Sequence, residues 1–428
     1  MKIEQLYNKF LECVSVSTDS RSIEEGAMYF ALKGDNFDGN KFAQQAKEKG
    51  TRYCIVDNSE ISEQDSDFIL VDDVLNTLQA LAKHHRQQLK YPIIALTGSN
   101  GKTTTKELIY AVLSKKYKVK ATIGNLNNHI GVPLTLLRFR PDDDFGIVEM
   151  GANHQKEIIF LCSIAQPDYG LITNFGKAHL EGFGSIEGVI KGKSELYDYL
   201  KSNNKTAFIN SNDTIQTEKI GSYDKVISFG SDVQNDISIQ FISANPFVNV
   251  KFKDVVISSH LIGSYNYANI AVAIALGDYF KVNLKGIENG IENYSPDNNR
   301  SQIIEKANNK IILDAYNANP TSMLAALENF KNLEAKQKFL FLGDMFELGN
   351  TSTKEHQAIV DYIESNFETS TVFLTGKHFA STIAKSNIKT YNSFDDLKAE
   401  LKHHSIKNAS ILIKGSRGMA LERVLEIL

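Results

Sequence analysis

The sequence predicts an α/β protein of three domains, and chain length, strand–helix alternation and two polar breaks lead to that prediction. With 428 residues the chain exceeds what one hydrophobic core usually organises, so two or three domains are expected. Apolar strands alternate with helical stretches from residue 93 onward, which is typical of mostly parallel sheets covered on both faces. Breaks near residues 91 and 296 divide the chain into expected domains 1–88, 89–297 and 298–428.

The first domain is expected to be a small α/β unit. Strand-like runs occur at residues 27–31 (AMYFA) and 53–56 (YCIV), with a helical stretch near residues 42–49. A polar, helix-prone run follows at residues 81–90. Tyr91-Pro92 ends that helix, because the residue before a proline disfavours helical geometry, and opens a new strand.

The second domain is expected to be built on a mostly parallel sheet of the P-loop type. From Ile93 the pattern runs through an apolar strand, a glycine-containing turn and a helix. Further apolar strands follow at residues 145–150 (FGIVEM) and 169–173 (YGLIT). Residues 205–261 are richer in strands separated by polar turns. We expect them to form an antiparallel flank of the same domain.

The third domain is expected to be Rossmann-like. Residues 292–300 (ENYSPDNNR) are polar, contain Pro296 and indicate a linker. After it the alternation of strands and helices restarts. Strands are expected at residues 311–313, 339–342, 372–374 and 411–413, and helices from Thr321 and from Thr353.

Composition and charge exclude several classes of protein. A hydrophobic content of 42%, with 23% charged residues, is that of an ordinary soluble globular chain. The net charge of −4 argues against a nucleic-acid partner, which would require a basic excess to neutralise phosphates. Residues 1–10 lack the apolar run of a signal peptide, and no stretch has the roughly 20 apolar residues that span a bilayer. We therefore expect a cytoplasmic protein with no membrane partner, and a monomer.

A phosphate-binding loop is the clearest chemical signal. Residues 93–107 read IIALTGSNGKTTTKE, in which backbone N–H groups at a helix start can face an anion. Lys102 supplies charge and Thr103 a hydroxyl for magnesium. The strict Walker motif fails because Leu96 stands where its first glycine belongs. The expected nucleotide-binding residues here are Gly98, Ser99, Asn100, Gly101, Lys102, Thr103 and Thr104.

An acidic side chain follows the next predicted strand. Glu149 ends the strand FGIVEM, where a doubly wound sheet presents residues to its ligand crevice. An acidic residue there can hold a metal that bridges phosphates, although a strand-end glutamate often faces solvent. His179 lies in a glycine-rich stretch and Lys193 in KGKSELY; taken singly, each is open to a structural interpretation.

Together these segments resemble the Mur ligase family over essentially the whole chain. The shortened loop T-G-x-x-G-K-T is shared by Mur ligases and folylpolyglutamate synthetases. The resemblance implies that Lys102, Glu149, His179 and Lys193 are catalytic. It also implies that Thr103, Glu149, His179 and Lys193 hold two Mg²⁺ ions, with Lys193 carbamylated, and that ATP is a substrate.

The resemblance also assigns substrate residues. Residues 18–39 look like a uridine-nucleotide-binding domain, with Ser20, Asp35, Asn36 and Phe37 at the UDP group; taken alone, that segment indicates a surface loop. Residues 124–133 (GNLNNHIGVP) are similar to the members that add D-alanyl-D-alanine, and imply that Asn125, Asn127 and Asn128 contact a muramoyl group.

Two further segments complete the implied nucleotide site. GSYNYAN resembles G-x-x-N-x-x-N, which places Asn266 and Asn269 at the adenine; an amide offers both a donor and an acceptor. The C-terminal part contributes Arg300, Asp314 and Lys414 to ATP. The segment DAYNANPTSM, with Asn317 as a substrate residue, is the strongest mark of the D-alanyl-D-alanine-adding members.

The implied activity is an ATP-dependent ligation through an acyl phosphate, with UDP-N-acetylmuramoyl-tripeptide and D-alanyl-D-alanine as substrates. Another Mur ligase or a folylpolyglutamate synthetase is the alternative within the same class. From a different class, a P-loop kinase of small molecules would use the same loop. Such a kinase would require neither Lys193 nor a third Rossmann-like domain.

Overall fold

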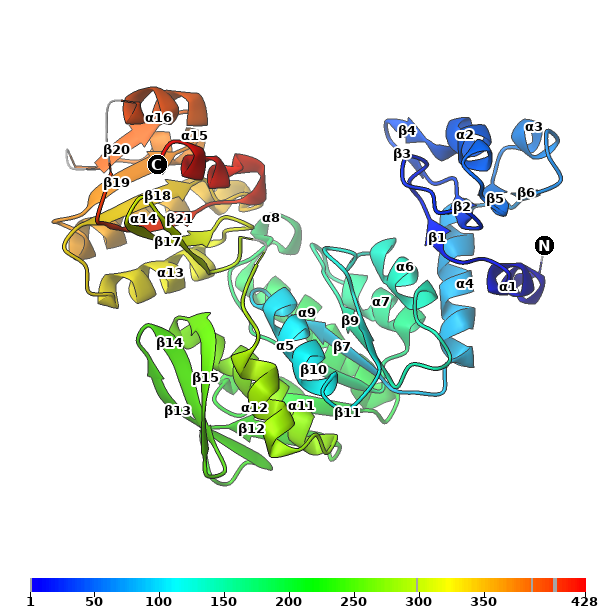
Figure 1. Ribbon diagram of the computed structural model, residues 1–428, viewed down its shortest axis with the longest axis horizontal. Helices are drawn as coiled ribbons and strands as arrows, with labels where there is room; N and C mark the ends of the chain where they lie inside the picture. Colours follow the sequence, from blue (N-terminus) through cyan, green and yellow to red (C-terminus); the bar gives the residue numbers. More distant parts are fainter. Residues whose placement is uncertain (1, 298, 386–387, 403–405) are drawn as a thin grey trace.

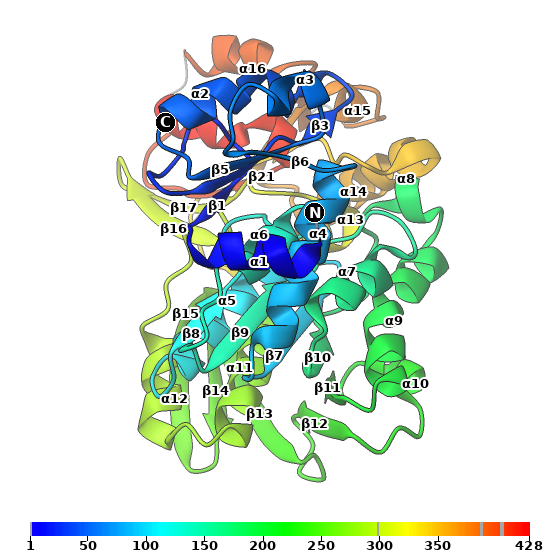
Figure 2. The ribbon, with the colours of Figure 1, turned by 90° about the vertical axis from the view of Figure 1, so that its right-hand side faces the viewer.

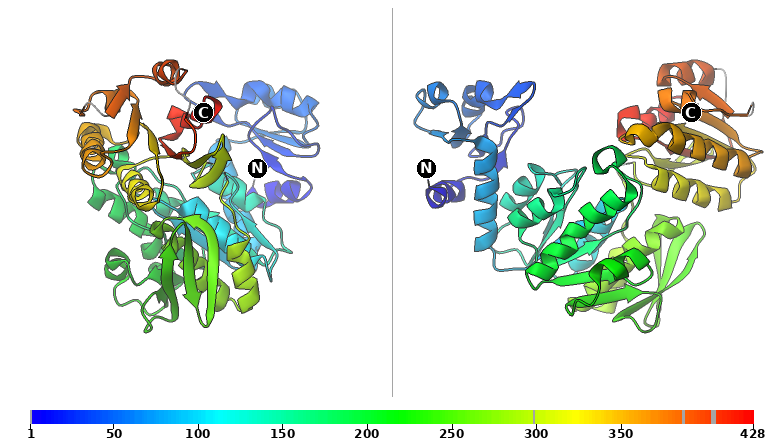
Figure 3. Two further views of the ribbon diagram at one scale, coloured as in Figure 1. Left: turned by 60° about the vertical axis from the view of Figure 1, so that its left-hand side comes forward. Right: turned by 180° about the vertical axis from the view of Figure 1, so that it is seen from behind.

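The structure is a computed structural model that describes residues 2–297, 299–385, 388–402 and 406–428. It is an α/β protein whose larger sheets lie in three successive parts of the chain (Figure 1). The N-terminal and C-terminal parts lie at opposite ends of the central one, as the view from behind also shows (Figure 3).

The N-terminal part holds a parallel sheet of four short strands in the order β1-β2-β5-β6. Its strands are β1 (Val16–Ser17), β2 (Met28–Phe30), β5 (Tyr53–Val56) and β6 (Phe68–Leu70). A two-stranded hairpin, β3 (Lys33–Gly34) and β4 (Phe37–Asp38), projects beside it. The helices are α1 (Ile3–Leu11), α2 (Ala43–Glu48), α3 (Ser59–Ser62) and α4 (Val74–Gln88), with the 3₁₀ turn η1 (Gly39–Phe42). Every residue of β2 is buried, which its uninterrupted apolar sequence predicts.

The central part is built on a nine-stranded sheet in the order β15-β14-β13-β12-β11-β10-β7-β9-β8. The strands are β7 (Ile93–Thr97), β8 (Val119–Ala121), β9 (Phe145–Glu149), β10 (Tyr169–Ile172), β11 (Thr206–Asn210), β12 (Val226–Gly230), β13 (Ile237–Ala244), β14 (Phe247–Phe252) and β15 (Val255–Ile262). The strands from β7 to β13 pair in parallel with their neighbours in this part of the sheet. Strands β13, β14 and β15 pair antiparallel with one another. The predicted parallel sheet and its antiparallel flank are thus present, although β8 and β14 were not predicted.

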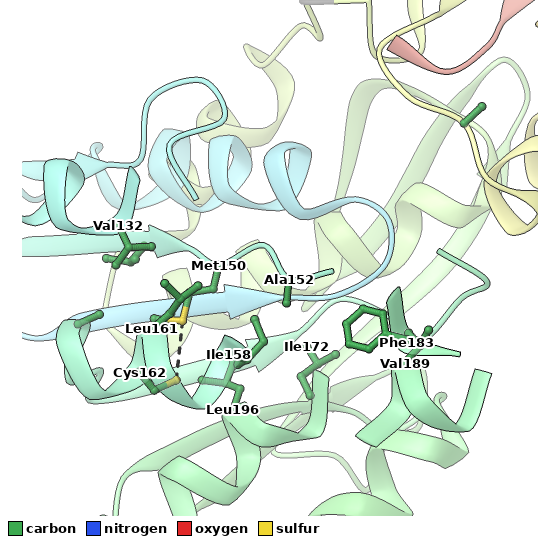
Figure 4. Packing of buried hydrophobic residues seen from close by; sticks show 14 of the residues in the cluster. Val132, Met150, Ala152, Ile158, Leu161, Cys162, Ile172, Phe183, Val189 and Leu196 are labelled. Atoms are coloured by element: carbon green, nitrogen blue, oxygen red, sulfur yellow. Dashed lines mark hydrogen bonds between the residues drawn. The ribbon is translucent and has the colours of Figure 1, made fainter. Parts of the chain in front are cut away.

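Helices cover both faces of this sheet and leave the carboxyl ends of its strands open. They are α5 (Lys102–Leu113), α6 (Gly131–Leu137), α7 (Glu157–Ala165), α8 (Leu180–Phe183), α9 (Ile186–Ser202), α10 (Thr214–Ile220), α11 (Tyr267–Tyr279) and α12 (Leu284–Glu292), with η2 (Ser264–Asn266) before α11. Strands β7 and β9 are buried along their whole length, as strands covered on both faces must be. Figure 4 shows the apolar layer in which Met150, Ile158 and Leu196 meet.

The C-terminal part carries a six-stranded sheet in the order β16-β17-β21-β18-β19-β20, with only β16 antiparallel. Its strands are β16 (Gln302–Lys306), β17 (Asn309–Asp314), β18 (Lys338–Gly343), β19 (Thr371–Thr375), β20 (Ile388–Tyr391) and β21 (Ser410–Lys414). Its helices are α13 (Pro320–Asn332), α14 (Ser352–Asn366), α15 (Lys377–Ala380) and α16 (Phe394–Leu401), with the 3₁₀ turns η3 (Gly349–Thr351), η4 (Arg417–Met419) and η5 (Leu421–Glu426). All four predicted strands are present, whereas β16 and β20 were missed.

The connections between the three parts differ in kind. Helix α4 packs against α6 and α7, and its Arg86 donates to Asp168 Oδ2 at 2.7 Å, so this helix joins the N-terminal part firmly to the central one. Between α12 and β16 the chain has no regular structure, as expected of the linker; Asn298 within it lies outside the described residues. In Figure 2, which views the molecule from the N-terminal end, the N-terminal part is drawn in front of the C-terminal part, from which it is well separated in Figure 1.

The helices and the three cysteine thiols bear on membrane crossing and on redox chemistry. Within the described residues, no helix is long and apolar enough to cross a bilayer. Cys13, Cys54 and Cys162 are free and buried. Burial raises the pKa of the Cys13 thiol to about 11, so that thiol stays protonated near neutral pH.

Candidate active site

A cavity of about 710 Å³ opens at the carboxyl ends of β7, β9 and β10 and continues to the C-terminal part. It brings together most of the predicted site residues. These are Ser99, Asn100, Gly101, Lys102, Thr103, Thr104, Asn125, Asn127, Asn128, Glu149, His179, Asn266, Asn269, Arg300, Asp314, Asn317 and Lys414. The predicted residues Gly98, Lys193, Ser20, Asp35, Asn36 and Phe37 are not part of its lining.

The phosphate loop is a tight turn that only glycine fits at two positions. Gly98 has φ 145° and Gly101 has φ 79°, in the range that side-chain-bearing residues rarely adopt. A Cβ on Gly98 would lie 2.0 Å from Thr173 Oγ1, and one on Gly101 would lie 2.7 Å from Asn269 Oδ1. The loop is therefore pressed against β10 and α11. These contacts and the two glycine conformations fix the shape of the phosphate loop.

Lys102 begins α5 and folds back over the loop. Its Nζ donates to the carbonyl oxygen of Gly98 at 2.8 Å. Burial lowers the pKa of Lys102, and Arg300 adds to that, while the Glu149 carboxylate opposes it. The ammonium thus lies at the rim of the loop, where a phosphate would find the charge that the sequence predicts.

Glu149 joins three elements at the end of β9. It is 2% exposed, and its carboxylate accepts from Thr103 Oγ1 at 3.0 Å and from Asn127 Nδ2 at 2.8 Å. The phosphate-loop helix and the segment that carries Asn125, Asn127 and Asn128 therefore meet on one carboxylate. Asn128 also has a local role, because its Oδ1 accepts from the backbone N–H of Gly131, the first residue of α6, at 2.8 Å.

Oxygen ligands suited to magnesium are present beside the loop. The Thr103 hydroxyl and the Glu149 carboxylate are hard donors, and Mg²⁺ sites in nucleotide enzymes combine one or two such groups with phosphate oxygens. Among the described residues, no three His, Cys, Asp or Glu side chains gather around a point that could hold a metal. The donor set thus fits an ion that ATP brings with it, and does not form a closed metal cage.

His179 faces the C-terminal part. It adopts φ 53°, and its Nδ1 lies 2.5 Å from Glu347 Oε2. The hydrogen bond from His179 lowers the pKa of Glu347. Glu347 lies 168 positions after His179 in the sequence, and no spacing rule connects the two residues. The partner of His179 was therefore missed.

Lys193 lies on α9 behind the cavity wall. The side chain is fully buried, with Nζ donating to the Ala152 carbonyl oxygen at 2.9 Å and 5.1 Å from the centre of the Phe183 ring. Burial, followed by the charge of Lys102, lowers the pKa of Lys193 well below its ordinary value. This burial excludes an ordinary surface lysine on an amphipathic helix. Ala152 and Phe183 belong to one buried apolar cluster, in which Figure 4 labels both.

Asn266 and Asn269 form a hydrogen-bonded pair at the start of α11. Asn266 Nδ2 donates to the Ile262 carbonyl oxygen at 2.8 Å, and its Oδ1 accepts from Asn269 Nδ2 at 2.8 Å. Asn269 Oδ1 accepts from Thr105 Oγ1 at 3.0 Å. Both residues line the cavity, but their amides already have protein partners. Their clearest structural effect is to support the phosphate loop at Gly101.

The C-terminal part contributes a charged cluster. Asp314 Oδ2 lies 2.5 Å from Lys414 Nζ, and its Oδ1 accepts from the Ser301 backbone at 3.1 Å. The Arg300 guanidinium stacks 3.5 Å from the centre of the Tyr316 ring. Tyr316 was not predicted as a site residue, although it stands in the segment DAYNANPTSM. Asn317 is exposed at the rim, with its Oδ1 accepting from the Ala318 backbone at 2.9 Å.

The residues assigned to a UDP group lie in the N-terminal part. Asp35 and Asn36 form the exposed turn of the β3–β4 hairpin, and Phe37 stacks on Phe42 with ring centres 5.4 Å apart. Ser20 is buried, and its Oγ donates to Gln45 Oε1 at 3.3 Å. The structure thus separates these residues from the cavity.

Three family models match the chain in succession. They describe the Mur ligase family, catalytic domain, at residues 12–86, the Mur ligase middle domain at residues 96–277, and the Mur ligase, glutamate ligase domain, at residues 299–417. With this order of domains around one phosphate-loop cavity, the chain belongs to the Mur ligase family.

Its relatives narrow the likeness within the family. The UDP-N-acetylmuramoyl-tripeptide–D-alanyl-D-alanine ligase of Bacillus subtilis is 35% identical, over 96% of this chain and 92% of that one. The Escherichia coli protein of the same name is 34% identical, over 97% and 93%. Among solved structures, MurF from Acinetobacter baumannii has a TM-score of 0.86, with 29% identity over 99% of this chain and 98% of that chain. MurF ligase from Thermotoga maritima, in complex with ADP, has a TM-score of 0.84, with 26% identity over 98% and 97%.

Proposed function

We propose that this chain is an ATP-dependent ligase that joins D-alanyl-D-alanine to UDP-N-acetylmuramoyl-tripeptide and so forms the pentapeptide precursor of peptidoglycan. The observation that carries the proposal is the junction at Glu149. A phosphate loop and an asparagine-rich segment meet there on one carboxylate within one cavity. The two close relatives named for this reaction support the choice of substrates.

The chemistry proceeds in two steps. An oxygen of the tripeptide's terminal carboxylate attacks the γ-phosphorus of ATP, which yields an acyl phosphate and ADP. The amine of D-alanyl-D-alanine then attacks the acyl carbon, loses a proton and displaces inorganic phosphate. A free carboxylate would have to lose oxide, a very poor leaving group, so phosphorylation makes the substitution feasible. Lys102 stabilises the charge on the transferring phosphoryl group, and most of the catalysis is electrostatic and positional.

The separation of the N-terminal residues from the cavity suits a long substrate. Asp35, Asn36 and Phe37 would hold the UDP end on the exposed hairpin. Asn125, Asn127 and Asn128 would contact the muramoyl group closer to the reacting carboxylate. An extended UDP-sugar peptide has both ends that such an arrangement requires, whereas a small kinase substrate would leave the hairpin without a role.

Magnesium is proposed to be held by Thr103, Glu149 and His179, together with a modified Lys193, at two ion positions. Bound there, Mg²⁺ would neutralise phosphate charge as the acyl phosphate forms. Glu149 orients the Thr103 hydroxyl through their 3.0 Å hydrogen bond. His179 would first have to exchange its contact with Glu347.

The proposed modification of Lys193 is a carbamate. The neutral amine attacks carbon dioxide, one N–H proton leaves, and the product is an anion with two oxygens. The lowered pKa of Lys193 favours that neutral amine. Its Nζ donates to the Ala152 carbonyl oxygen, and no carboxylate among the described residues is hydrogen-bonded to it.

For the nucleotide, we propose that Asn266, Asn269, Arg300, Asp314 and Lys414 surround the base and ribose, and that Gly98 to Thr104 enclose the phosphates. Support comes from the cavity, which all of these residues except Gly98 line, and from the T. maritima relative in complex with ADP. The boundaries after residues 88 and 297, a monomeric state and a cytoplasmic location remain predictions.

A single reaction distinguishes these functions. The protein is incubated with ATP, magnesium, UDP-N-acetylmuramoyl-tripeptide and D-alanyl-D-alanine, and products are measured by mass. We expect the pentapeptide, ADP and one inorganic phosphate per turnover. A product only with D-glutamate or a folate would identify another ligase of the class. A phosphorylated alcohol without free phosphate would identify a kinase.

A further inference from the structure

The phosphate loop is contacted by the C-terminal part through one side-chain pair. Asn319 Nδ2 donates to Asn100 Oδ1 at 2.7 Å, across 219 positions of sequence. Asn100 is the third residue of the loop, and Asn319 precedes α13 in the segment DAYNANPTSM. Asn319 is not among the residues that are proposed to bind substrate or to act in catalysis.

Asn319 uses its two side-chain atoms for two different tasks. Its Oδ1 accepts from the Ser322 backbone at 2.9 Å, which caps the N-terminus of α13. Its Nδ2 is not required for the cap and faces the loop. The residue is only 7% exposed, so the contact is shielded from water. A shorter capping residue would preserve the helix and lose the contact.

Asn100 is held firmly from the other side. Its backbone N–H donates to Asn174 Oδ1 at 3.0 Å, and its carbonyl oxygen accepts from Thr173 Oγ1 at 2.6 Å. The backbone of Asn100 is thus bound to the end of β10, and only its side chain reaches the C-terminal part. A change in the contact made by that side chain therefore affects the loop that would hold the phosphates.

Further close contacts join the central and C-terminal parts around this pair. Lys177 N donates to Thr321 Oγ1 at 2.9 Å, in the first turn of α13, and Lys177 Nζ pairs with Glu355 at 2.7 Å. A Cβ on Gly176 would lie 3.1 Å from both Asn100 Nδ2 and Thr321 Oγ1. The contact therefore forms only when α13 is seated closely on the loop.

We propose that Asn319 is a positioning residue that couples the seating of the C-terminal part to the shape of the phosphate loop. Nucleotide in the loop orients the Asn100 side chain, and that side chain then holds α13 through Asn319. By linkage, the seated C-terminal part raises the affinity for nucleotide by the same factor. The inference rests on the proposed ATP site, but not on the identity of the amine or carboxylate substrate.

The test compares Asn319→Ser with wild type, because serine caps a helix as well as asparagine but cannot reach Asn100. Asn283→Ser is the matched control, since Asn283 caps α12 through Gly286 N at 2.7 Å away from the cavity. Affinity for a non-hydrolysable ATP analogue is measured by calorimetry. We expect a loss of roughly fivefold for Asn319→Ser and none for Asn283→Ser.

A double-mutant cycle and amide hydrogen exchange complete the experiment. Asn100→Ala and the double variant should each lose the same roughly fivefold, whereas independent effects would multiply to roughly 25-fold. The analogue should slow exchange at residues 321–323 in wild type and in Asn283→Ser, but not in Asn319→Ser. The proposal would be overturned if the two losses of affinity multiplied in the double variant. It would also be overturned if the analogue slowed exchange in Asn319→Ser as much as in wild type. A wild type that binds the analogue but forms no pentapeptide would instead refute the proposed function and leave these readings valid.

Discussion

The phosphate loop and the N-terminal hairpin are proposed to hold two ends of one reacting complex, but they are built in opposite ways. The loop is set by backbone hydrogen bonds, by Gly98 and Gly101 in unusual conformations, and by close contacts with neighbouring elements. The hairpin presents Asp35 and Asn36 in an exposed turn, with Phe37 49% exposed. A preformed region can act on the transition state, whereas an exposed one contributes mainly to binding. Substitutions in the loop are therefore expected to affect catalysis, and substitutions in the hairpin mainly binding.

The largest effect is expected for Lys102→Ala. The substitution removes the charge at the rim of the loop and little core packing, so turnover should fall by about 10²-fold or more. The melting temperature should stay close to that of wild type. The measurements are steady-state kinetics and calorimetry on the same preparation. Activity above about a tenth of wild type would contradict the role given to this lysine.

Lys193→Ala should be nearly inactive as well, for a different reason. It removes the proposed carbamate, whose two oxygens are the hard ligands that magnesium prefers. Short carboxylic acids at high concentration should partly restore turnover, because they can supply the missing oxygens. Lys102→Ala serves as the control, since no carboxylate can replace its charge. Absence of rescue, with a bare amine seen in a well-resolved crystal at neutral pH, would refute the carbamate.

The pH dependence of wild type follows from the same lysine. Carbamate formation requires the neutral amine, and burial lowers the pKa of Lys193 so that this form persists to lower pH than for an exposed lysine. As pH falls through that pKa, the amine protonates and the carbamate is lost. We expect activity in carbon-dioxide-free buffer to fall and to recover with bicarbonate, more completely at pH 8 than at pH 6. Equal activity with and without carbon dioxide would contradict this expectation.

Much of the catalytic half of the site could be predicted from the sequence, because local patterns encode it. The strand, the turn and Lys102 are consecutive, and Glu149 ends a buried strand whose position follows from the parallel order. The pairs His179–Glu347 and Asn100–Asn319 could not be predicted, since they join residues that are distant in sequence and meet only after three sheets have packed. Strand β14 was missed although its residues alternate between buried and partly exposed, as a strand pattern should. Strands β8, β16 and β20 lie at or next to sheet edges and have mixed polarity, which periodicity alone does not distinguish from loops.

Asn269→Ala is expected to show an intermediate effect. The amide supports Thr105 and packs against Gly101, so its loss should loosen the phosphate loop and raise the KM for ATP about tenfold. Stability should fall by about 1–3 kcal/mol, because Thr105 and Asn266 lose buried partners. Kinetics at varied ATP and thermal unfolding measure the two effects. A large fall in kcat at saturating ATP would mean that Asn269 acts in the chemical step.

The smallest effect is expected for Phe37→Ala on the hairpin. The ring stacks on Phe42 and leaves half of its surface open, so it offers an apolar face to the UDP end of the substrate and nothing to the reacting atoms. Its loss should raise the KM for the UDP substrate about three- to tenfold while kcat and the KM for ATP stay unchanged. Leu70→Ala is the matched control, because Leu70 is also an exposed apolar residue of the N-terminal part, at 46%, and does not belong to the hairpin. If Phe37→Ala instead lowered kcat, the hairpin would take part in the transition state, and the contrast between a preformed loop and a binding hairpin would fail.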